Sequence, residues 1–214
     1  MAKEGYPFIG FFLVLSLIFG VTAVIFSQVI LTVLGILSLV MTVFSLYFFR
    51  DPERDVPNDP SKIISPADGR IVAIEKVSDE FVGARAIRIS IFLNIFNVHV
   101  NRVPCSGSVV NSRYKPGKFF AAFDDRSSEE NEQTIIDLQN KRFKIRMKQI
   151  AGLIARRIVN YLKPGEKVSL GQRFGLIRFG SRIDVIVPES VDIIVELKQK
   201  VTGGETVLGE YNEV

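Results

Sequence analysis

The stretch Gly171-Gln-Arg-Phe-Gly-Leu-Ile-Arg-Phe-Gly-Ser-Arg-Ile-Asp-Val-Ile-Val-Pro188 holds two β-rich runs on either side of one small bend. Val, Ile and Phe suit a pleated, half-buried surface, so residues 174–179 and 183–187 predict two strands. The bend between them is Gly180-Ser181-Arg182, where glycine permits unusual backbone angles and leaves its carbonyl carbon open to approach.

Two interpretations of Gly180-Ser181 differ in their chemistry. Gly and Ser dominate turns for ordinary conformational reasons, so the dipeptide alone favours an inert turn. In the other interpretation, the hydroxyl of Ser181 attacks the carbonyl of Gly180, which is its own preceding peptide bond. That attack needs a base to take the hydroxyl proton and donors to hold the developing oxyanion, so the rest of the chain decides.

The charges of this 214-residue chain are unevenly spread. Residues 5–49 contain no Lys, Arg, Asp, Glu or His, and the later part is an ordinary charged sequence. The net charge of +4 favours an anionic membrane surface but is too small to indicate nucleic acid. With one cysteine, Cys105, and one histidine, His99, neither an intrachain disulfide nor a His/Cys zinc site is expected.

The charge-free run is long enough for two membrane-spanning helices, since each needs about 20 apolar residues. We expect helices near Pro7–Ile25 and Val29–Phe49. A signal peptide has a shorter apolar core and fits poorly. A hairpin buried inside a globular domain is the alternative, although few domains of this size hide so long a run.

Two spans would place both chain ends on the same side of the membrane. Lys3 precedes the spans, and Arg50 and Arg54 follow them, so the positive-inside tendency predicts a cytoplasmic domain at the cell (inner) membrane. The expected organisation is a membrane anchor over residues 1–49, a Pro-rich linker over 50–60 and a β-rich domain over 61–214.

The domain after the linker is expected to be built from many short strands. Residues 86–93 alternate, with isoleucine or leucine on one face, and residues 133–138 and 142–149 alternate as well. The expected class is therefore mainly β (α+β). Faintly similar turns at Ala67-Asp68-Gly69 and Phe179-Gly180-Ser181 indicate a barrel sandwich of the biotinyl/lipoyl kind.

Motifs along the chain carry a family resemblance. They are Phe48-Phe-Arg-Asp-Pro-Glu-Arg54, Ser65-Pro-Ala-Asp-Gly-Arg70, Asn97-Val-His-Val-Asn-Arg-Val-Pro104, Asn131-Glu132 and Phe179-Gly-Ser-Arg182. With these motifs in this order, the chain resembles the short, membrane-anchored form of phosphatidylserine decarboxylase over nearly its whole length.

The resemblance implies a proenzyme that cuts itself between Gly180 and Ser181. The products would be a β chain, residues 1–180, and an α chain, residues 181–214, which form a heterodimer. The α chain would begin with a pyruvoyl group made from Ser181. This covalent cofactor would form a Schiff base with phosphatidylserine from the membrane and accept the electrons released with CO2, giving phosphatidylethanolamine. The family chemistry needs no metal, and a higher oligomer stays open.

The resemblance also gives roles to Asp68 and His99. Asp68 matches the aspartate of the family's Pro-Ala-Asp-Gly motif and would orient and charge-stabilise a base, with an ordinary Asp-Gly turn as the alternative. His99 matches the family histidine tied to decarboxylation and suits proton transfer near neutral pH. A satisfied strand histidine is the alternative for this residue.

The sequence departs from the long form of the family at Arg102, where that form has a second histidine. Arginine stays protonated and cannot ordinarily act as a base. The base for self-cleavage therefore stays open between His99 serving both steps, Asp68 and water. Candidates for contact with the lipid carboxylate or phosphate are Arg102, Arg113, Lys115 and Lys118, although basic loop residues are commonly just solvated.

Two other hypotheses stay open at this point. The same chemistry could act on an archaeal ether lipid, archaetidylserine, because the headgroup carries the reaction. Alternatively, the chain could be a non-enzymatic, membrane-tethered β-sandwich that binds a partner, with an inert turn at Gly180-Ser181.

Overall fold

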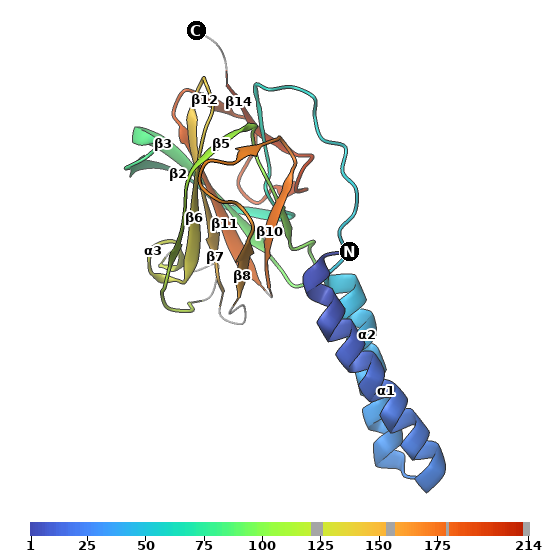
Figure 1. The fold of residues 1–214 in the computed structure, drawn as a ribbon. Helices are drawn as coiled ribbons and strands as arrows, with labels where there is room; N and C mark the ends of the chain where they lie inside the picture. The colour runs from blue at the N-terminus through green and yellow to red at the C-terminus, as the bar shows by residue number, and fades with distance from the viewer. Residues whose placement is uncertain (121–125, 153–156, 179, 212–214) are drawn as a thin grey trace. The chain divides into compact units, whose positions relative to one another are not determined.

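The computed structural model describes residues 1–120, 126–152, 157–178 and 180–211. The chain forms two compact units, Met1–Pro52 and Glu53–Val214. The first is a helical hairpin and the second is built almost wholly of strands, as Figure 1 shows. The expected fold class, mainly β with an N-terminal helical hairpin, is confirmed.

The hairpin consists of α1 (Tyr6–Phe26) and α2 (Val29–Phe48), preceded by a 3-10 turn over Lys3–Gly5. These bounds lie within one residue of the expected ones. Ser27 adopts a left-handed conformation with φ 51°, which ends α1 and turns the chain back. The sequence encodes this turn because Ser27-Gln28 interrupts the apolar run.

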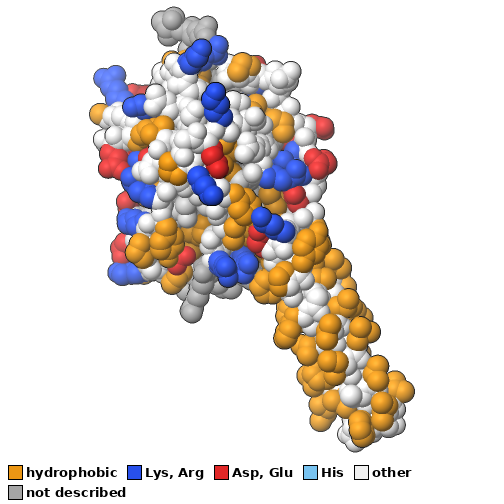
Figure 2. Space-filling view, in the orientation of Figure 1, with side chains coloured by type: hydrophobic (Ala, Val, Ile, Leu, Met, Phe, Trp, Pro, Cys, Tyr) orange, Lys and Arg blue, Asp and Glu red, His pale blue; other side chains and the backbone are white. Residues whose placement is uncertain are grey.

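The helices of the hairpin approach closely and expose apolar side chains. The hydroxyl of Ser16 donates a hydrogen bond to the carbonyl of Gly35 across the pair, at 3.0 Å. Both helices are long and apolar enough to cross a membrane, and Figure 2 shows an almost wholly hydrophobic surface along them. Small residues at the contact and apolar residues outside are typical of helices packed in lipid.

The β domain is organised around one antiparallel sheet of eight strands. Their order is β13 (Lys200–Val201), β2 (Gly69–Asp79), β3 (Gly83–Leu93), β11 (Ser181–Pro188), β7 (Lys144–Ile150), β6 (Gln133–Gln139), β5 (Gly107–Lys115) and β9 (Lys167–Val168). The alternating segments expected at 86–93, 133–138 and 142–149 correspond to β3, β6 and β7. β11 lies in the interior of the sheet, paired with β3 and β7.

Two three-stranded sheets and a short helix complete the domain. One sheet has the order β1 (Lys62–Ile64), β14 (Val207–Tyr211), β12 (Val191–Ile193), and the other β4 (Val100–Arg102), β10 (Arg173–Ile177), β8 (Ile158–Asn160). The helix is α3 (Ser127–Glu130). The strand expected over 174–179 is β10, which ends at Ile177; Phe179 lies outside the described residues.

The hydrophobic core lies between the eight-stranded sheet and its smaller neighbours. Ile183, Val185 and Val187 project from one face of β11 and join the core with residues of β3, while Phe174 and Ile177 join it from β10. This period-2 pattern follows from the alternation of side chains along a strand. The layered arrangement agrees with the sandwich character expected from the sequence.

The close pairing of β10 and β8 depends on Gly175. A Cβ at this position would collide with the backbone carbonyl oxygen of Val159. We therefore expect Gly175→Ala to lower the free energy of unfolding of the β domain by about 3 kcal/mol, the upper end of overpacking penalties. Thermal unfolding in detergent, followed by the circular dichroism of the strands, measures this loss.

Gly10→Ala is the matched control for that substitution, because nothing lies within 4 Å of a Cβ at Gly10 in α1. It should leave the unfolding of the β domain unchanged. Equal stability of Gly175→Ala and the unaltered protein would contradict the packing described for β10.

Candidate active site

Three connections between the large sheet and the β4–β10–β8 sheet lie at one edge of the large sheet. β3 leads to β4, β7 leads to β8, and β10 leads to β11. Leu93, the last residue of β3, pairs with Ser181, the first of β11. Ile150, the last residue of β7, pairs with Arg182. Ser181 therefore lies where three strands of the large sheet begin or end.

The register of β4 brings His99 to this same edge. β4 and β10 are antiparallel, with Val100 opposite Leu176. Continued by one residue, this register sets His99 opposite Ile177, where β10 ends. The segments that carry His99 and Ser181 thus meet at the edge, although 82 positions (181 − 99) separate the residues in sequence.

The facing of the two sheets is fixed by a hydrogen bond between amide side chains. The Gln149 side chain of β7 donates to Oδ1 of Asn101 in β4 at 2.8 Å and to the carbonyl of Val159 at 3.3 Å. Gln149 lies opposite Ile183, so it projects from the core face of the large sheet. Asn101 therefore projects towards that face. It follows His99 by two residues in the chain.

Ser181 is completely buried, with 0% of its surface exposed. Its hydroxyl has no hydrogen-bond partner among the residues that the structure describes. Buried hydroxyls nearly always have partners, so this one is unusual and chemically available. The preceding Gly180 has φ +62°, and among the residues that the structure describes no atom lies within 4 Å of a Cβ placed there, so its backbone conformation favours glycine.

His99 is also buried, at 2% exposure, and its ring is oriented by the backbone. Nδ1 lies 2.9 Å from the carbonyl oxygen of Asn97. A carbonyl oxygen only accepts, so Nδ1 carries a proton here, and Nε2 is the nitrogen that can accept a proton when the ring is neutral. The side-chain oxygens of Asn94 and Asn97 cap backbone N–H groups of the preceding loop, which fixes the segment that carries His99.

Asp68 lies directly before the start of β2, which is two strands away from β11 in the order β2–β3–β11. Its carboxylate receives two hydrogen bonds from one guanidinium nitrogen of Arg54, at 2.9 and 3.0 Å, and one from the N–H of Gly203 at 2.8 Å. Within the described part of the chain it makes no hydrogen bond to His99. The carboxylate is thus held as an ion pair by a residue of the motif at 48–54.

Arg102 is buried at the end of β4 that lies farther from His99. Its guanidinium donates to the carbonyl of Gly171 at 3.2 Å, and the backbone N–H of Arg102 donates to the carbonyl of Pro66 at 2.8 Å. A Cβ at Gly204 would lie 2.7 Å from Cδ of Arg102. The side chain is therefore packed into the domain beside the segment that carries Asp68.

The remaining basic candidates lie on a different part of the domain. Arg113 pairs with Glu80, Lys115 donates to the carbonyl of Glu129 at 2.9 Å, and Lys118 pairs with Glu130 at 2.8 Å. Arg113 and Lys115 belong to β5, which β6 and β7 separate from β11. At about 4.8 Å per strand, Arg113 and Lys115 lie three strand spacings from β11 and are not brought to Ser181. Lys118 lies beyond the end of β5, in an isolated bridge to Asn131.

Sequence reasoning missed two polar pairs near Ser181. One is Asn101 with Gln149, which retain an amide donor and an amide acceptor unbonded among the described residues. The other is Arg182 with Asp184, an ion pair of 2.7 Å with exposures of 1% and 0%. The second pair left a signal in the sequence, since both signs of charge interrupt an otherwise apolar strand.

Comparison with known proteins gives the family. Residues 41–209 match the family described as phosphatidylserine decarboxylase. A phosphatidylserine decarboxylase proenzyme of Desulfotalea psychrophila is 47% identical over 212 residues, covering 98% of this chain and 96% of the relative. Proenzymes of the same description from Pelobacter propionicus (47% identity; 98% and 96% covered) and Chlorobium chlorochromatii (49%; 81% and 82%) are similar as well.

The chain therefore belongs to the phosphatidylserine decarboxylase family. It is an enzyme of that class, which sets aside the alternative of a non-enzymatic binding module.

The single cysteine is not a competing nucleophile. Burial raises the pKa of the Cys105 thiol to about 12. At pH 8 roughly one thiol in ten thousand is then ionised, and the thiolate is the reactive form. We expect Cys105 in the folded protein to resist iodoacetamide at pH 8, as measured by intact mass.

The same reagent in denaturant is the control, because an exposed thiol has a pKa near 8.5 and should react completely. Rapid alkylation of the folded protein would contradict the burial of Cys105.

Proposed function

We propose that this enzyme cuts itself between Gly180 and Ser181 and then decarboxylates phosphatidylserine to phosphatidylethanolamine with a pyruvoyl group made from Ser181. The observation that carries the proposal is the buried hydroxyl of Ser181. It follows a glycine of positive φ and lies at the edge of the sheet to which the register of β4 also brings His99, a buried histidine whose ring is oriented by the backbone.

In the proposed self-cleavage, His99 takes the hydroxyl proton through Nε2 while the oxygen of Ser181 attacks the carbonyl carbon of Gly180. The peptide C–N bond breaks, the released nitrogen takes that proton back from His99, and an ester forms in place of the peptide bond. Elimination removes the Cα proton of residue 181, breaks the bond between the ester oxygen and Cβ, and leaves Gly180 with a carboxylate. The double bond that remains at residue 181 takes a proton at Cβ. Water then replaces the nitrogen of residue 181, which departs as ammonia, and a ketone remains.

The pyruvoyl group supplies an electron sink for the loss of CO2. The chain's own residues enclose the position where that group would form, since Ser181 is fully buried. His99 is placed to hold or return the proton that replaces the carboxyl group. Asp68 would support the site indirectly, because its carboxylate holds Arg54 and the turn at Gly203 in place. It is not proposed as a hydrogen-bond partner of His99.

The arrangement of the strands supports a stable heterodimer of the two products. The proposed α chain would contribute β11 between β3 and β7, β13 beside β2, and β14 beside β1. Every one of those neighbours belongs to the proposed β chain. The fragments would therefore stay joined by ladder hydrogen bonds after the peptide bond is lost.

The proposed location is the cell membrane, with the β domain on the cytoplasmic side. The apolar hairpin supports membrane attachment, and Lys3, Arg50 and Arg54 at its ends support the orientation. The substrate would then reach the site from the lipid layer in which the hairpin sits. Archaetidylserine carries the same headgroup, and a comparison of vesicles made of each lipid separates the two substrates.

Ser181→Ala tests the nucleophile. We expect the purified variant to remain a single chain of 24.0 kDa without decarboxylase activity, because no hydroxyl is left to attack Gly180. The unaltered protein should give two fragments, residues 1–180 and 181–214, on denaturing electrophoresis and intact-mass analysis. Ser78→Ala, at an exposed serine, is the matched control and should be cut normally. Cleavage of Ser181→Ala would reject the mechanism.

His99→Gln tests the shared base. Because Nε2 is the only proton acceptor proposed, we expect self-cleavage to slow by about 100-fold or more, the usual contribution of a general base. The time course of fragment appearance after expression measures this rate. A variant that is cut at the normal rate yet cannot decarboxylate would restrict His99 to the second step.

A further inference from the structure

Directly after Ser181, the chain places a buried ionic network. Nε of Arg182 lies 2.7 Å from Oδ1 of Asp184, and Nη2 of Arg182 donates to the hydroxyl of Ser90 at 2.6 Å. The hydroxyl of Ser128 donates to Oδ2 of Asp184 at 2.8 Å. Each of these four side chains is at most 1% exposed, so the network is closed to water.

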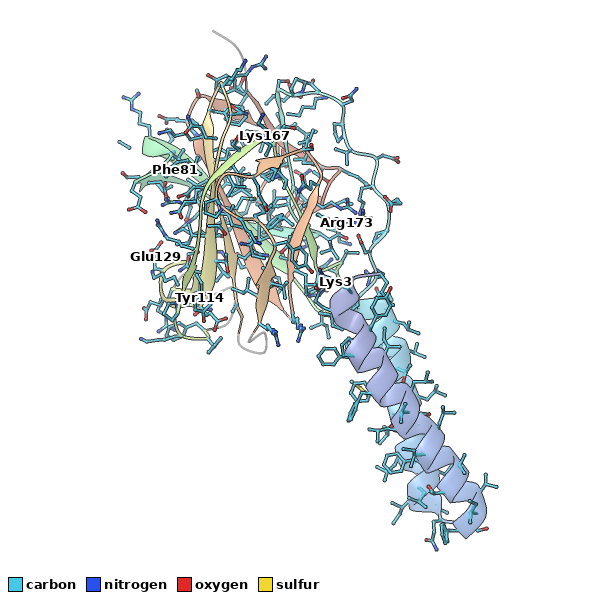
Figure 3. All side chains as sticks on the ribbon, viewed as in Figure 1. Lys3, Phe81, Tyr114, Glu129, Lys167 and Arg173 are labelled. Atoms are coloured by element: carbon cyan, nitrogen blue, oxygen red, sulfur yellow. The ribbon has the colours of Figure 1, made fainter. Side chains whose placement is uncertain are left out.

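The network lies on the face of the large sheet opposite to Ser181. Side chains alternate along β11, so Ser181 and Ile183 project into the core while Arg182 and Asp184 project outwards. α3 covers this outer face and supplies Ser128. In Figure 3, Glu129 of α3 and Arg173 of β10 lie on opposite sides of the large sheet, as expected from these contacts.

Neighbouring charges hold α3 over the network. Glu129 lies 3.7 Å from both Arg88 and Lys148, which belong to the strands on either side of β11. Lys148 is directly opposite Asp184 in the register. The face thus contains Arg88, Lys148 and Arg182 against Asp184 and Glu129, and Glu75 pairs with Arg88 at its margin.

The hydrogen bonds of this network cross the bond that is proposed to be cut. Ser90 and Ser128 belong to residues 1–180, whereas Arg182 and Asp184 belong to residues 181–214. Both the Arg182–Ser90 and the Asp184–Ser128 hydrogen bonds would therefore join the two product chains. They do so at the second and fourth residues of the new chain, next to the reactive group.

A buried ion pair calls for a role other than stability, because the free-energy cost of desolvating the two charges often outweighs their attraction. An apolar pair would fill the same space in β11 without that cost. A cut chain acquires a new end, and chain ends fray unless they are tied down. Here the new chain end is residue 181, which would carry the reactive group and must therefore stay in place. A displacement of about 1 Å in an active site can lower the rate about 100-fold.

We propose that the Arg182–Asp184 network is a clamp that fixes the new chain end after cleavage and so positions the reactive group. The inference rests on the self-cleavage proposed above. Arg182 and Asp184 act as positioning residues: they hold the backbone of β11 from behind and touch neither the substrate nor the reacting atoms.

The test compares Arg182→Met in two backgrounds, the self-cleaving protein and the uncut Ser181→Ala protein. In the uncut chain the preceding segment also holds residue 181, so the loss of the clamp should matter less. We expect the fall in Tm to be at least about twice as large in the cut protein, which measures the coupling between the clamp and the cut. Amide hydrogen exchange at residues 182–184 should accelerate in the cut variant alone.

Activity provides a second measurement. For the cut fraction of Arg182→Met, we expect kcat on phosphatidylserine vesicles to fall by about 100-fold with KM little changed, because the group is misplaced and not removed. Ser128→Ala deletes only a contact across the cut and should shift each quantity in the same direction by less. If Arg182→Met fails to fold, Ser128→Ala is measured in its place.

The matched control is Arg146→Met. Arg146 forms a comparable buried pair with Asp137, with Nε–Oδ1 at 2.6 Å, but both residues precede the cut. Its removal should lower Tm equally in the cut and uncut proteins, because that pair does not join the product chains.

The possible failures can be told apart. Unaltered protein that stays in one piece would reject the proposed cleavage itself. Normal cleavage with equal Tm losses in both backgrounds, or with normal kcat for Arg182→Met, would reject the clamp and leave the cleavage standing. A block of cleavage in Arg182→Met would assign the network to the precursor and would also overturn the clamp.

Discussion

The pairing of β11 on both of its sides is the constraint on which the rest of the domain depends. Leu93 of β3 pairs with Ser181 and Ile150 of β7 pairs with Arg182, so the first residues of β11 are held from both sides. The same ladders bring the segment after β3, which carries His99, to the edge where β11 begins. A central strand is therefore both the stiffest part of the sheet and the carrier of the candidate nucleophile.

Local patterns in the sequence were sufficient to predict the helices and strands but not which distant segments lie together in the fold. The charge-free run predicted the hairpin, and Val, Ile and Phe around Gly180-Ser181 predicted β10 and β11. The placement of the segments that carry His99 and Ser181 at one edge depends on pairings between distant strands, which no local pattern contains. Asp68 matched a motif, yet its partner proved to be Arg54, because the chain before the domain folds back against the turn at Gly203.

The outer face of β11 shows a second limit of sequence reasoning. Arg182 and Asp184 have the alternation of a half-exposed strand, whose polar side normally faces water. In the structure α3 covers that side, so the charges are buried and paired. A helix of four residues is too short to show a periodic pattern in the sequence. Because α3 was not predicted, the burial of Arg182 and Asp184 was not predicted either.

The interleaving of β11, β13 and β14 with strands from earlier in the chain bears on the life of each molecule. A small fragment whose strands β11 and β14 are paired on both sides cannot be withdrawn and exchanged while the rest of the domain stays folded. Under the proposed cleavage, every copy would make its own reactive group once and keep it. Damage to that group would then inactivate the molecule permanently. The cell would recover the lost decarboxylase activity only by synthesising new chains.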